Sequence, residues 1–277
     1  MKFWKYHGLG NDFALIDGLH GRADVDPGFA ERQCRRNTGI GADGILYLLP
    51  GRDGADVSMR ILNADGSEAE MCGNGIRCLA KHAYDTGAVR GKSFRVWTRA
   101  GIKAVDCAVG PDGRVESVEV GMGKPLFGTS GSLGHEGYSE ETVEVLGRKV
   151  RGYNVSMGNP HFVTFQKLDD GAKDELGPAI EKHGAFPNRT NVEFAVPSGG
   201  GIDVRVFERG AGWTMACGTG ACATAVAGVL AGHVAAGEPI PVNLPGGTLT
   251  ITVGKDFDEV AMDGPAELVY EARLLNE

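Results

Sequence analysis

The sequence has no long apolar run, no excess of positive charge and no signal-like leader. A transmembrane helix needs about 20 consecutive apolar residues, and no stretch of this chain reaches that length. Lys and Arg total 28 against 36 Asp and Glu, without a basic stripe, which gives nucleic-acid binding no electrostatic support. Polar residues and glycines interrupt residues 1–17 too often for a secretory segment. We therefore expect a soluble, cytoplasmic protein that binds neither nucleic acid nor membranes.

Cysteine pairs with the spacing of metal or disulfide motifs are also missing. The even number of cysteines raises the possibility of a disulfide framework, but such frameworks belong to short secreted chains. No Cys-x2-Cys or His-x3-His pattern accompanies the cysteines, so the sequence predicts no metal site. We expect reduced thiols at all six positions: Cys34, Cys72, Cys78, Cys107, Cys217 and Cys222.

Glycine is abundant: there are 44 glycines but only 12 prolines. The glycines lie in short glycine-rich motifs such as GLGND, GIGADG, CGNG and CGTG rather than in low-complexity tracts. Glycine permits positive φ angles and lets backbone N–H groups approach a ligand closely. Several loops are therefore candidates for binding a small molecule.

The chain contains one pattern twice, at an offset of about 145 residues. Asn63 precedes Cys72 by nine residues, and Glu208 precedes Cys217 by nine. Each polar residue ends an alternating, strand-like run, and each cysteine begins a C-G-x-G turn followed by a helical stretch. A second match, G-N-D-F at 10–13 and G-N-P-H-F at 158–162, lies in the same order. Two ordered matches indicate an internal duplication.

The duplication predicts two similar α+β domains, each a curved, mostly antiparallel sheet wrapped around a central helix. We assign residues 1–120 with 266–277 to the first domain and residues 121–265 to the second, with the boundary in the glycine-rich stretch 121–137. Helices are expected over 74–86 and 218–231, each ending at a glycine. The second is apolar on every face, so it should be buried all round. Strands are expected near 3–7, 13–17, 45–49, 57–62, 94–98, 102–108, 115–120, 153–157, 161–166, 192–196, 203–208, 247–252, 258–262 and 267–273.

The two repeated cysteines have the properties of an acid–base pair. A thiol at a helix N-terminus has its pKa lowered by the unpaired N–H groups and the helix dipole. The adjacent amides, those of Gly73, Asn74, Gly218 and Thr219, are suited to hold a carboxylate. If the pseudo-symmetry places the two helix starts face to face, one α-carbon lies between two thiols, as stereoinversion requires. The simpler interpretation, a small buried hydrophobic residue, fits Cys34, Cys78, Cys107 and Cys222 better.

The motifs around both cysteines resemble those of diaminopimelate epimerases. The resemblance lies in Asn63-Ala-Asp-Gly-Ser-x4-Cys72-Gly-Asn-Gly-Ile-Arg77 and in Glu208-Arg-Gly-Ala-Gly-x-Thr-x-Ala-Cys217-Gly-Thr-Gly-Ala. It extends to the opening K-Y-H-G-L-G-N-D-F and the central G-N-P-H-F, and so covers essentially the whole chain. The resemblance implies interconversion of LL- and meso-2,6-diaminopimelate, without pyridoxal phosphate or metal, in lysine and peptidoglycan precursor biosynthesis. It also implies a homodimer, and a last strand that returns to the first domain.

The resemblance further implies a role for each matching residue. Cys72 and Cys217 would be the catalytic acid and base, and His161 and Glu208 would poise their thiols. The reacting carboxylate would be bound by the four helix-start amides named above. The substrate's amino groups and distal carboxylate would be bound by Asn11, Asn63, Asn159, Asn191, Glu208 and Arg209. An ammonium and a second carboxylate need acidic, guanidinium and amide groups together, which this set provides.

Two positions depart from the family or vary within it. Gly44 stands where some members carry glutamine, so only a backbone contact is available there. Trp213 lies where members vary, and its role stays open between packing and substrate contact.

Alternative interpretations remain. Gly39–Gly44 matches G-x-G-x-x-G formally, but it lacks the preceding strand and following helix of a dinucleotide site. A glycine-rich binding module with incidental thiols would tolerate loss of both cysteines. A related two-cysteine racemase of another amino acid, such as histidine, is the closer rival. Proline racemases fit less well, because their first motif reads C-G-H.

Overall fold

The protein is described here by a computed structural model that covers residues 1–19, 25–128 and 138–275. These residues form two compact units, one of residues 1–121 with 263–277 and one of residues 122–262. Part of the stretch in which the sequence places the domain boundary, residues 129–137, lies outside the described residues. We call them unit 1 and unit 2.

Unit 1 is built around one mixed sheet in which most neighbouring strands are antiparallel. The strand order is β19-β1-β2-β3-β4-β6-β7-β8, and only the pairs β2–β3 and β4–β6 are parallel. The strands are β1 (Lys2–Gly8), β2 (Asn11–Asp17), β3 (Gly44–Pro50), β4 (Val57–Asn63), β6 (Ser93–Thr98), β7 (Gly101–Val109), β8 (Val115–Gly123) and β19 (Glu267–Arg273), with the short β5 (Glu68–Ala69) against β4.

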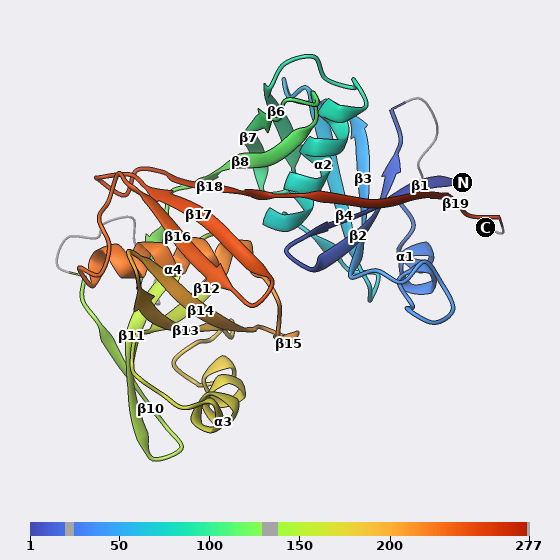
Figure 1. The fold of residues 1–277 in the computed structure, drawn as a ribbon. Coiled ribbons are helices and arrows are strands. Elements are labelled where there is room, and N and C mark those ends of the chain that lie inside the picture. The colour runs from blue at the N-terminus through green and yellow to red at the C-terminus, as the bar shows by residue number, and fades with distance from the viewer. Residues whose placement is uncertain (20–24, 129–137, 276–277) are drawn as a thin grey trace. The chain divides into compact units, whose positions relative to one another are not determined.

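Helix α2 (Gly73–Asp85) packs against the unit 1 sheet, mainly on β1, β3 and β7 (Figure 1). All of its residues from Gly73 to Ala83 are buried. The short helix α1 (Pro27–Gln33) begins after the N-cap Asp26, with Pro27 at its first position. Its buried residues Phe29 and Ala30 pack in an apolar cluster with strand residues such as Ile45.

Unit 2 repeats the arrangement of unit 1 strand by strand. Its order β11-β12-β13-β14-β16-β17 has β12–β13 and β14–β16 as the parallel pairs, in the same places as β2–β3 and β4–β6. These strands are β11 (Arg148–Ser156), β12 (Pro160–Thr164), β13 (Asn191–Ser198), β14 (Gly201–Glu208), β16 (Pro239–Leu244) and β17 (Gly247–Val253). The others are β9 (Leu126–Phe127), β10 (Glu141–Val145) and β15 (Gly212–Trp213), and β18 (Val260–Pro265) begins in unit 2 and ends in unit 1.

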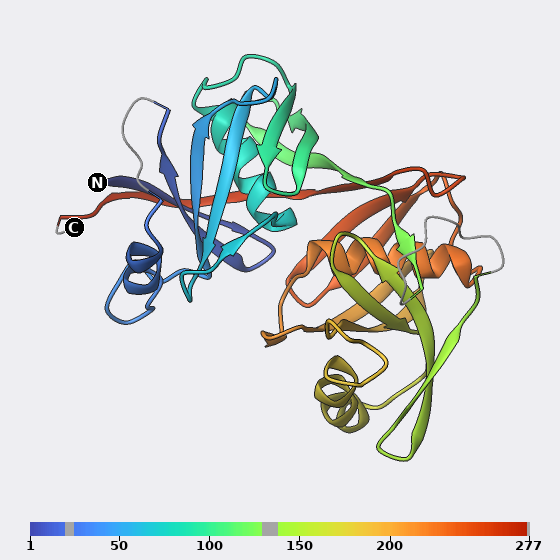
Figure 2. The ribbon, with the colours of Figure 1, turned by 180° about the vertical axis from the view of Figure 1, so that it is seen from behind.

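Helix α4 (Gly218–Leu230) has the place in unit 2 that α2 has in unit 1 (Figure 2). The sheet curves around it, and its residues from Gly220 to Gly228 are all buried. The predicted all-round burial of this helix is confirmed, and so is the α+β class. The second helix of unit 2, α3 (Asp170–Glu181), packs Leu176 and Ile180 against Phe162 and Val192.

Every predicted strand and both predicted helices are present, with bounds shifted by a few residues. Sequence reasoning missed α1, α3, β10 and β16, and the two-residue strands β5, β9 and β15. Helix α3 contains two glycines and Pro178, which break helical patterns, yet its N-cap Asp169 and its buried face maintain it. Strand β16 contains Pro239 and Pro241, residues that usually exclude a strand assignment.

None of the described helices combines the length and the apolar character needed to span a bilayer.

Candidate active site

The first half of the candidate site lies at the N-terminus of α2. Cys72 is the N-cap residue, with extended backbone angles (φ −139°, ψ 119°), and its Sγ accepts a hydrogen bond of 3.4 Å from the N–H of Gly75. Gly73 and Asn74 are the first two helical residues, whose N–H groups have no acceptor one turn earlier in the helix. The predicted cysteine at a helix start is therefore confirmed in unit 1.

Asn11 connects Cys72 to the strands of unit 1. Its Oδ1 lies 4.0 Å from Cys72 Sγ and accepts a 3.1 Å hydrogen bond from Nδ2 of Asn74. Its own Nδ2 donates to Oδ2 of Asp43 at 2.8 Å. Asp43 also binds Arg36, at 2.6 Å. The Asn11 side chain is thus oriented by contacts at both its oxygen and its nitrogen.

Among the described residues, Arg77 is the largest side chain that is completely buried, and it holds the start of α2 in place. It donates to the carbonyl of Gly73 at 3.0 Å, to Oδ1 of Asn74 at 2.9 Å and to the carbonyl of Pro265 at 3.2 Å. Because Asn74 Oδ1 faces Arg77, its Nδ2 faces Asn11. The guanidinium therefore fixes the orientation of the Asn74 amide.

Asn63 ends β4 and is the direct antiparallel partner of Gly44 in β3. The Asn63 side chain donates to Oγ of Ser67 at 3.0 Å and is partly exposed. A Cβ atom at Gly44 would lie 2.7 Å from the carbonyl oxygen of Leu62, closer than real Cβ contacts. A side chain at position 44 therefore requires a backbone shift, which explains why this chain has glycine there.

The second half of the candidate site lies at the N-terminus of α4 and repeats the first. Cys217 is the N-cap residue (φ −127°, ψ 109°), and its Sγ accepts a 3.3 Å hydrogen bond from the N–H of Gly220. The hydroxyl of Thr219 lies 3.6 Å from the same sulfur. Gly218 and Thr219 are the first two helical residues, so the predicted helix start is confirmed in unit 2 as well.

The predicted lowering of the pKa is wrong for Cys217. Burial raises the pKa of its thiol well above the ordinary value, and the carboxylates of Glu208 and Glu193 raise it further. Hydrogen bonds from Thr219 and Gly220 act in the opposite direction but are outweighed. Helix-start donors are present as expected, but desolvation and two nearby acidic groups decide the charge state of this thiol.

Glu208 is held by a neighbouring threonine. The hydroxyl of Thr214 donates a 2.6 Å hydrogen bond to its Oε1. Glu208 ends β14 just as Asn63 ends β4, so the polar residue at the end of the strand differs between the two units.

His161 is buried and bonded at both ring nitrogens. Its Nδ1 lies 2.7 Å from Oε1 of Glu193, and its Nε2 lies 3.0 Å from Oδ1 of Asn159. Glu193 is completely buried, and burial raises the pKa of its carboxyl although His161 lowers it. Sequence reasoning missed Glu193, since an acidic residue inside an apolar strand was its only signal.

Asn191 and Arg209 form a separate polar group in unit 2. The Asn191 side chain donates to the carbonyl of Pro160 at 2.8 Å and accepts from the N–H of Arg209 at 2.9 Å. The guanidinium of the exposed Arg209 donates to the carbonyl of Asn188 at 2.8 Å.

Trp213, whose role the sequence left open, packs against neighbouring side chains of unit 2. Its ring packs edge-to-face on Phe207 at 5.4 Å, and Arg205 lies 4.3 Å from its centre.

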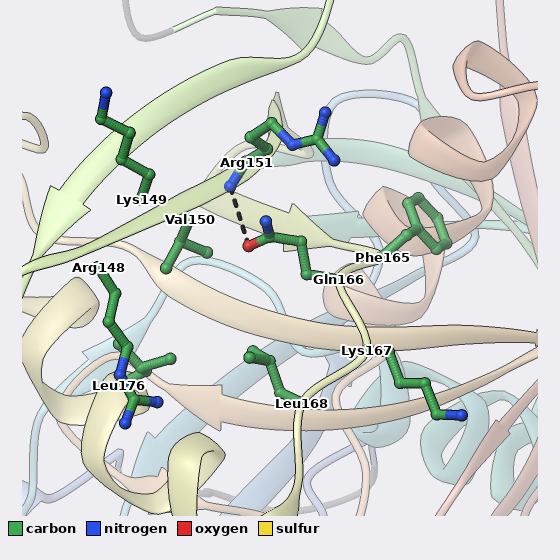
Figure 3. Close-up of a pocket in the computed structure, with 9 residues that line it drawn as sticks. All are labelled: Arg148, Lys149, Val150, Arg151, Phe165, Gln166, Lys167, Leu168 and Leu176. Atoms are coloured by element: carbon green, nitrogen blue, oxygen red, sulfur yellow. Dashed lines mark hydrogen bonds between the residues drawn. The ribbon is translucent and has the colours of Figure 1, made fainter.

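Unit 2 has two hollows, of which one contains a predicted site residue and the other contains none. One, of about 260 Å³, is lined by His161, Thr190 and Asn188 among others. The other, of about 450 Å³, lies between β11 and the segment that leads to α3, and contains none of the predicted site residues. Its basic residues Arg148, Lys149 and Lys167 point away from one another, so they do not form one anion site (Figure 3). Among the described residues, no group of three or more His, Cys, Asp or Glu is placed to hold a metal ion.

Comparison with known proteins places these features in one family. The family model described as diaminopimelate epimerase matches residues 3–127 and 153–269. A diaminopimelate epimerase of Pelotomaculum thermopropionicum is 49% identical over 98% of this chain and 97% of its own length. That of Desulforudis audaxviator is 47% identical over 99% of both. In fold, the chain is similar to a probable proline racemase from Agrobacterium radiobacter (TM-score 0.74, 15% identity, 100% of this chain and 93% of that one). A hydroxyproline epimerase from Agrobacterium vitis gives a TM-score of 0.71 at 15% identity, covering 99% of this chain and 90% of that one.

Proposed function

This chain belongs to the diaminopimelate epimerase family, and from that premise we propose that it interconverts LL- and meso-2,6-diaminopimelate in lysine and peptidoglycan precursor biosynthesis. One observation carries the chemistry: each unit places a cysteine as the N-cap of its central helix, with a first-turn N–H donating to the sulfur. Inversion at an α-carbon needs one group that removes a proton and another that delivers one from the opposite face. Two equivalent thiols, one from each unit, provide such a pair.

In this mechanism the two half-sites act on one substrate. A thiolate of one cysteine removes the α-proton, and the thiol of the other protonates the opposite face of the carbanion. Such general acid–base transfer contributes about 10²–10⁴-fold to the rate. The reaction proceeds without pyridoxal phosphate or a metal ion. The carbanion that forms at the α-carbon is stabilised because its negative charge spreads onto the adjacent carboxylate.

The carboxylate next to the reacting carbon binds the first-turn amides of both helices. The residues concerned are Gly73 and Asn74 in α2 and Gly218 and Thr219 in α4. These N–H groups point out of the helix starts, where the dipole favours negative charge. Removing one such donor from a comparable site costs about 10²–10³-fold in rate.

The far end of the substrate has a second amino group and a second carboxylate. Arg209, held by Asn188 and next to Asn191, supplies the guanidinium for that carboxylate. Glu208, oriented by Thr214, supplies a negative charge near both the thiol of Cys217 and the ammonium group. The remaining amide contacts come from Asn11, Asn63, Asn159 and Asn191, and His161 with Glu208 poises the thiols.

The enzyme acts in the cytoplasm as a homodimer that uses the exposed strand β19. Its Leu268, Val269 and Tyr270 are 38%, 54% and 42% exposed, an unusual amount of apolar surface on a strand. Among the described strands β19 pairs with β1 on one edge, and a second copy would cover its apolar side chains. Size-exclusion chromatography with light scattering should give twice the chain mass, and Val269→Lys should give the monomer.

Proton exchange in D₂O tests the reaction. The purified enzyme should introduce deuterium at the α-position of diaminopimelate and interconvert its LL and meso forms. Cys72→Ser and Cys217→Ser should each abolish the inversion. Exchange on histidine, proline or glutamate instead of diaminopimelate would identify a different racemase, and a single cysteine variant with full inversion would exclude the two-thiol mechanism.

A further inference from the structure

His161 and Glu193 form an ionisable pair inside the core of unit 2. Both side chains are 0% exposed, and Nδ1 of His161 lies 2.7 Å from Oε1 of Glu193. The second carboxylate oxygen, Oε2, is buried and has no hydrogen-bond partner among the residues that the structure describes. Strands β12 and β13, which carry the two residues, are parallel neighbours.

Unit 1 has two apolar residues at the equivalent positions. In unit 2, His161 faces Asn191 across the parallel pair, and Glu193 lies two residues farther along β13. In unit 1, Phe13 faces Gly44 in the same way, and Leu46 lies two residues farther along β3. Phe13 and Leu46 are as deeply buried, at 2% and 0% exposure. The same fold position is therefore filled by apolar side chains in one unit and by a histidine and a glutamate in the other.

Stability does not explain this difference. Taking an ion pair out of water costs several kcal/mol per ion, and replacing such a pair by apolar residues of similar volume is often neutral or stabilising. Phe13 and Leu46 show that apolar side chains can fill this position of the fold. The pair in unit 2 is thus expected to serve the site rather than the core.

Glu193 also lies against the helix start that carries the thiol. A Cβ atom at Gly220 would be 3.0 Å from Oε1 of Glu193 and 3.2 Å from Sγ of Cys217. In unit 1 a Cβ atom at the corresponding Gly75 would have a side-chain carbon of Leu46 as its nearest neighbour, at 2.9 Å. The second glycine of C-G-T-G therefore makes room for a carboxylate beside Cys217, whereas the second glycine of C-G-N-G makes room for a leucine.

We propose that Glu193 is a positioning residue of the epimerase site, which fixes the His161 ring through Nδ1 and keeps Cys217 in its thiol form. The inference rests on the proposed function. A ring held by Nδ1 presents Nε2 to Asn159, which is one of the proposed substrate contacts. A negative charge beside the first turn of α4 disfavours a second one on the sulfur, so the free enzyme holds Cys217 as the thiol. Cys217 then gives its proton to the α-carbon in one direction of the reaction and, as the thiolate, removes it in the reverse direction.

Other groups besides Glu193 also face Cys217. Glu208 on β14 adds a second negative charge, and burial acts in the same direction. Thr219 and the N–H of Gly220 act in the opposite direction as hydrogen-bond donors. Removing the charge of Glu193 should therefore shift the balance towards the thiolate of Cys217.

The test compares Glu193→Gln with Glu181→Gln. Glu181 is also a buried acidic residue of unit 2 and pairs with Arg189, away from the cysteine, so it controls for loss of a buried carboxylate.

Two readouts are needed. The first is α-proton exchange on diaminopimelate over a range of pH. The second is the rate at which iodoacetamide alkylates Cys217, measured by peptide mass spectrometry with Cys72 as the internal reference. We expect Glu193→Gln to lower kcat by about 10- to 100-fold, the range found when a metal-ligating histidine loses its outer hydrogen-bond partner. It should also speed alkylation of Cys217 at neutral pH by at least about tenfold, as expected for a unit charge at this range.

A double variant separates a role in the site from a role in the fold. His161→Phe with Glu193→Leu copies the residues of unit 1 and should unfold at the same temperature as the parent or higher, while inversion is lost. If Glu193→Gln keeps the parent's kcat, pH profile and alkylation rate, the proposal is wrong, even if its melting temperature falls. If the parent itself exchanges no proton of diaminopimelate, the proposed function fails, but the alkylation rates still decide the effect of Glu193 on Cys217.

Discussion

The side chain of Asn11 is oriented by Asp43, which accepts a 2.8 Å hydrogen bond from Nδ2 and so turns Oδ1 towards Asn74 and Cys72. Asp43 is in turn held by Arg36 at 2.6 Å. The glycine-rich motif G-I-G-A-D-G thus contributes a carboxylate that orients a candidate substrate contact, rather than a nucleotide-binding turn. The contacts of Asp43 therefore account for this G-x-G-x-x-G match without a bound dinucleotide.

Asp43→Ala should reduce kcat/KM for diaminopimelate by about 10- to 100-fold, because Asn11 loses the acceptor that sets its orientation. Steady-state assays of both stereoisomers measure this effect. Asp112→Ala is the matched control, since its carboxylate accepts a hydrogen bond from the N–H of Arg114 in an exposed turn. Parent-like kinetics for Asp43→Ala would show that Asn11 is oriented by other contacts.

Thr214→Val should lower kcat about tenfold, because Glu208 loses its 2.6 Å hydrogen bond and an interaction of about 1.4 kcal/mol corresponds to a factor of ten. Thr214→Ser keeps the hydroxyl and should retain most of the activity. Rates of α-proton exchange for the two variants provide the measurement. Equal rates for valine and serine would assign the effect to packing.

Arg77→Met should destabilise the protein by about 3 kcal/mol or more, because it removes a buried cation and leaves its acceptors without their donor. Urea denaturation followed by circular dichroism measures the change. Arg95→Met, at an exposed position of β6, should change the stability by less than about 0.5 kcal/mol. Similar losses for both variants would contradict a special role of Arg77.

Asp12→Asn should destabilise the protein at neutral pH but not in acid. Burial alone would raise the pKa of Asp12, but hydrogen bonds and charge from Arg36 and Lys5 outweigh it, so the pKa is lower in the folded protein. A depressed pKa contributes stability above the unfolded value, near 4, and the contribution disappears as the pH falls through the folded value. We expect about 1–3 kcal/mol at pH 7, decreasing below about pH 4, in urea titrations at several pH values. A loss that is independent of pH would mean that the charge of Asp12 does not matter.

The duplication and both helix starts could be predicted from the sequence, because they depend on local chemistry. Cysteine followed by G-x-G, after an alternating strand, is enough to predict an N-cap thiol, and the apolar A-C-A-T-A-V-A run is enough to predict a buried helix. Helix α3 and strand β16 could not be predicted, since proline and glycine oppose their local propensity. Burial of residues such as Leu176 against distant strands compensates for that propensity.

The sequence by itself determined the family, the fold class and the positions of the two thiols, since all three depend on the order and spacing of residues along the chain. Only the tertiary structure decided the environment of each thiol. Glu193 lies 24 residues before Cys217 in the sequence and reaches it because β13 packs against α4, where burial makes a carboxylate effective. The pKa of Cys217 is therefore raised although its helix start should lower it, because desolvation and neighbouring charges depend on three-dimensional distance.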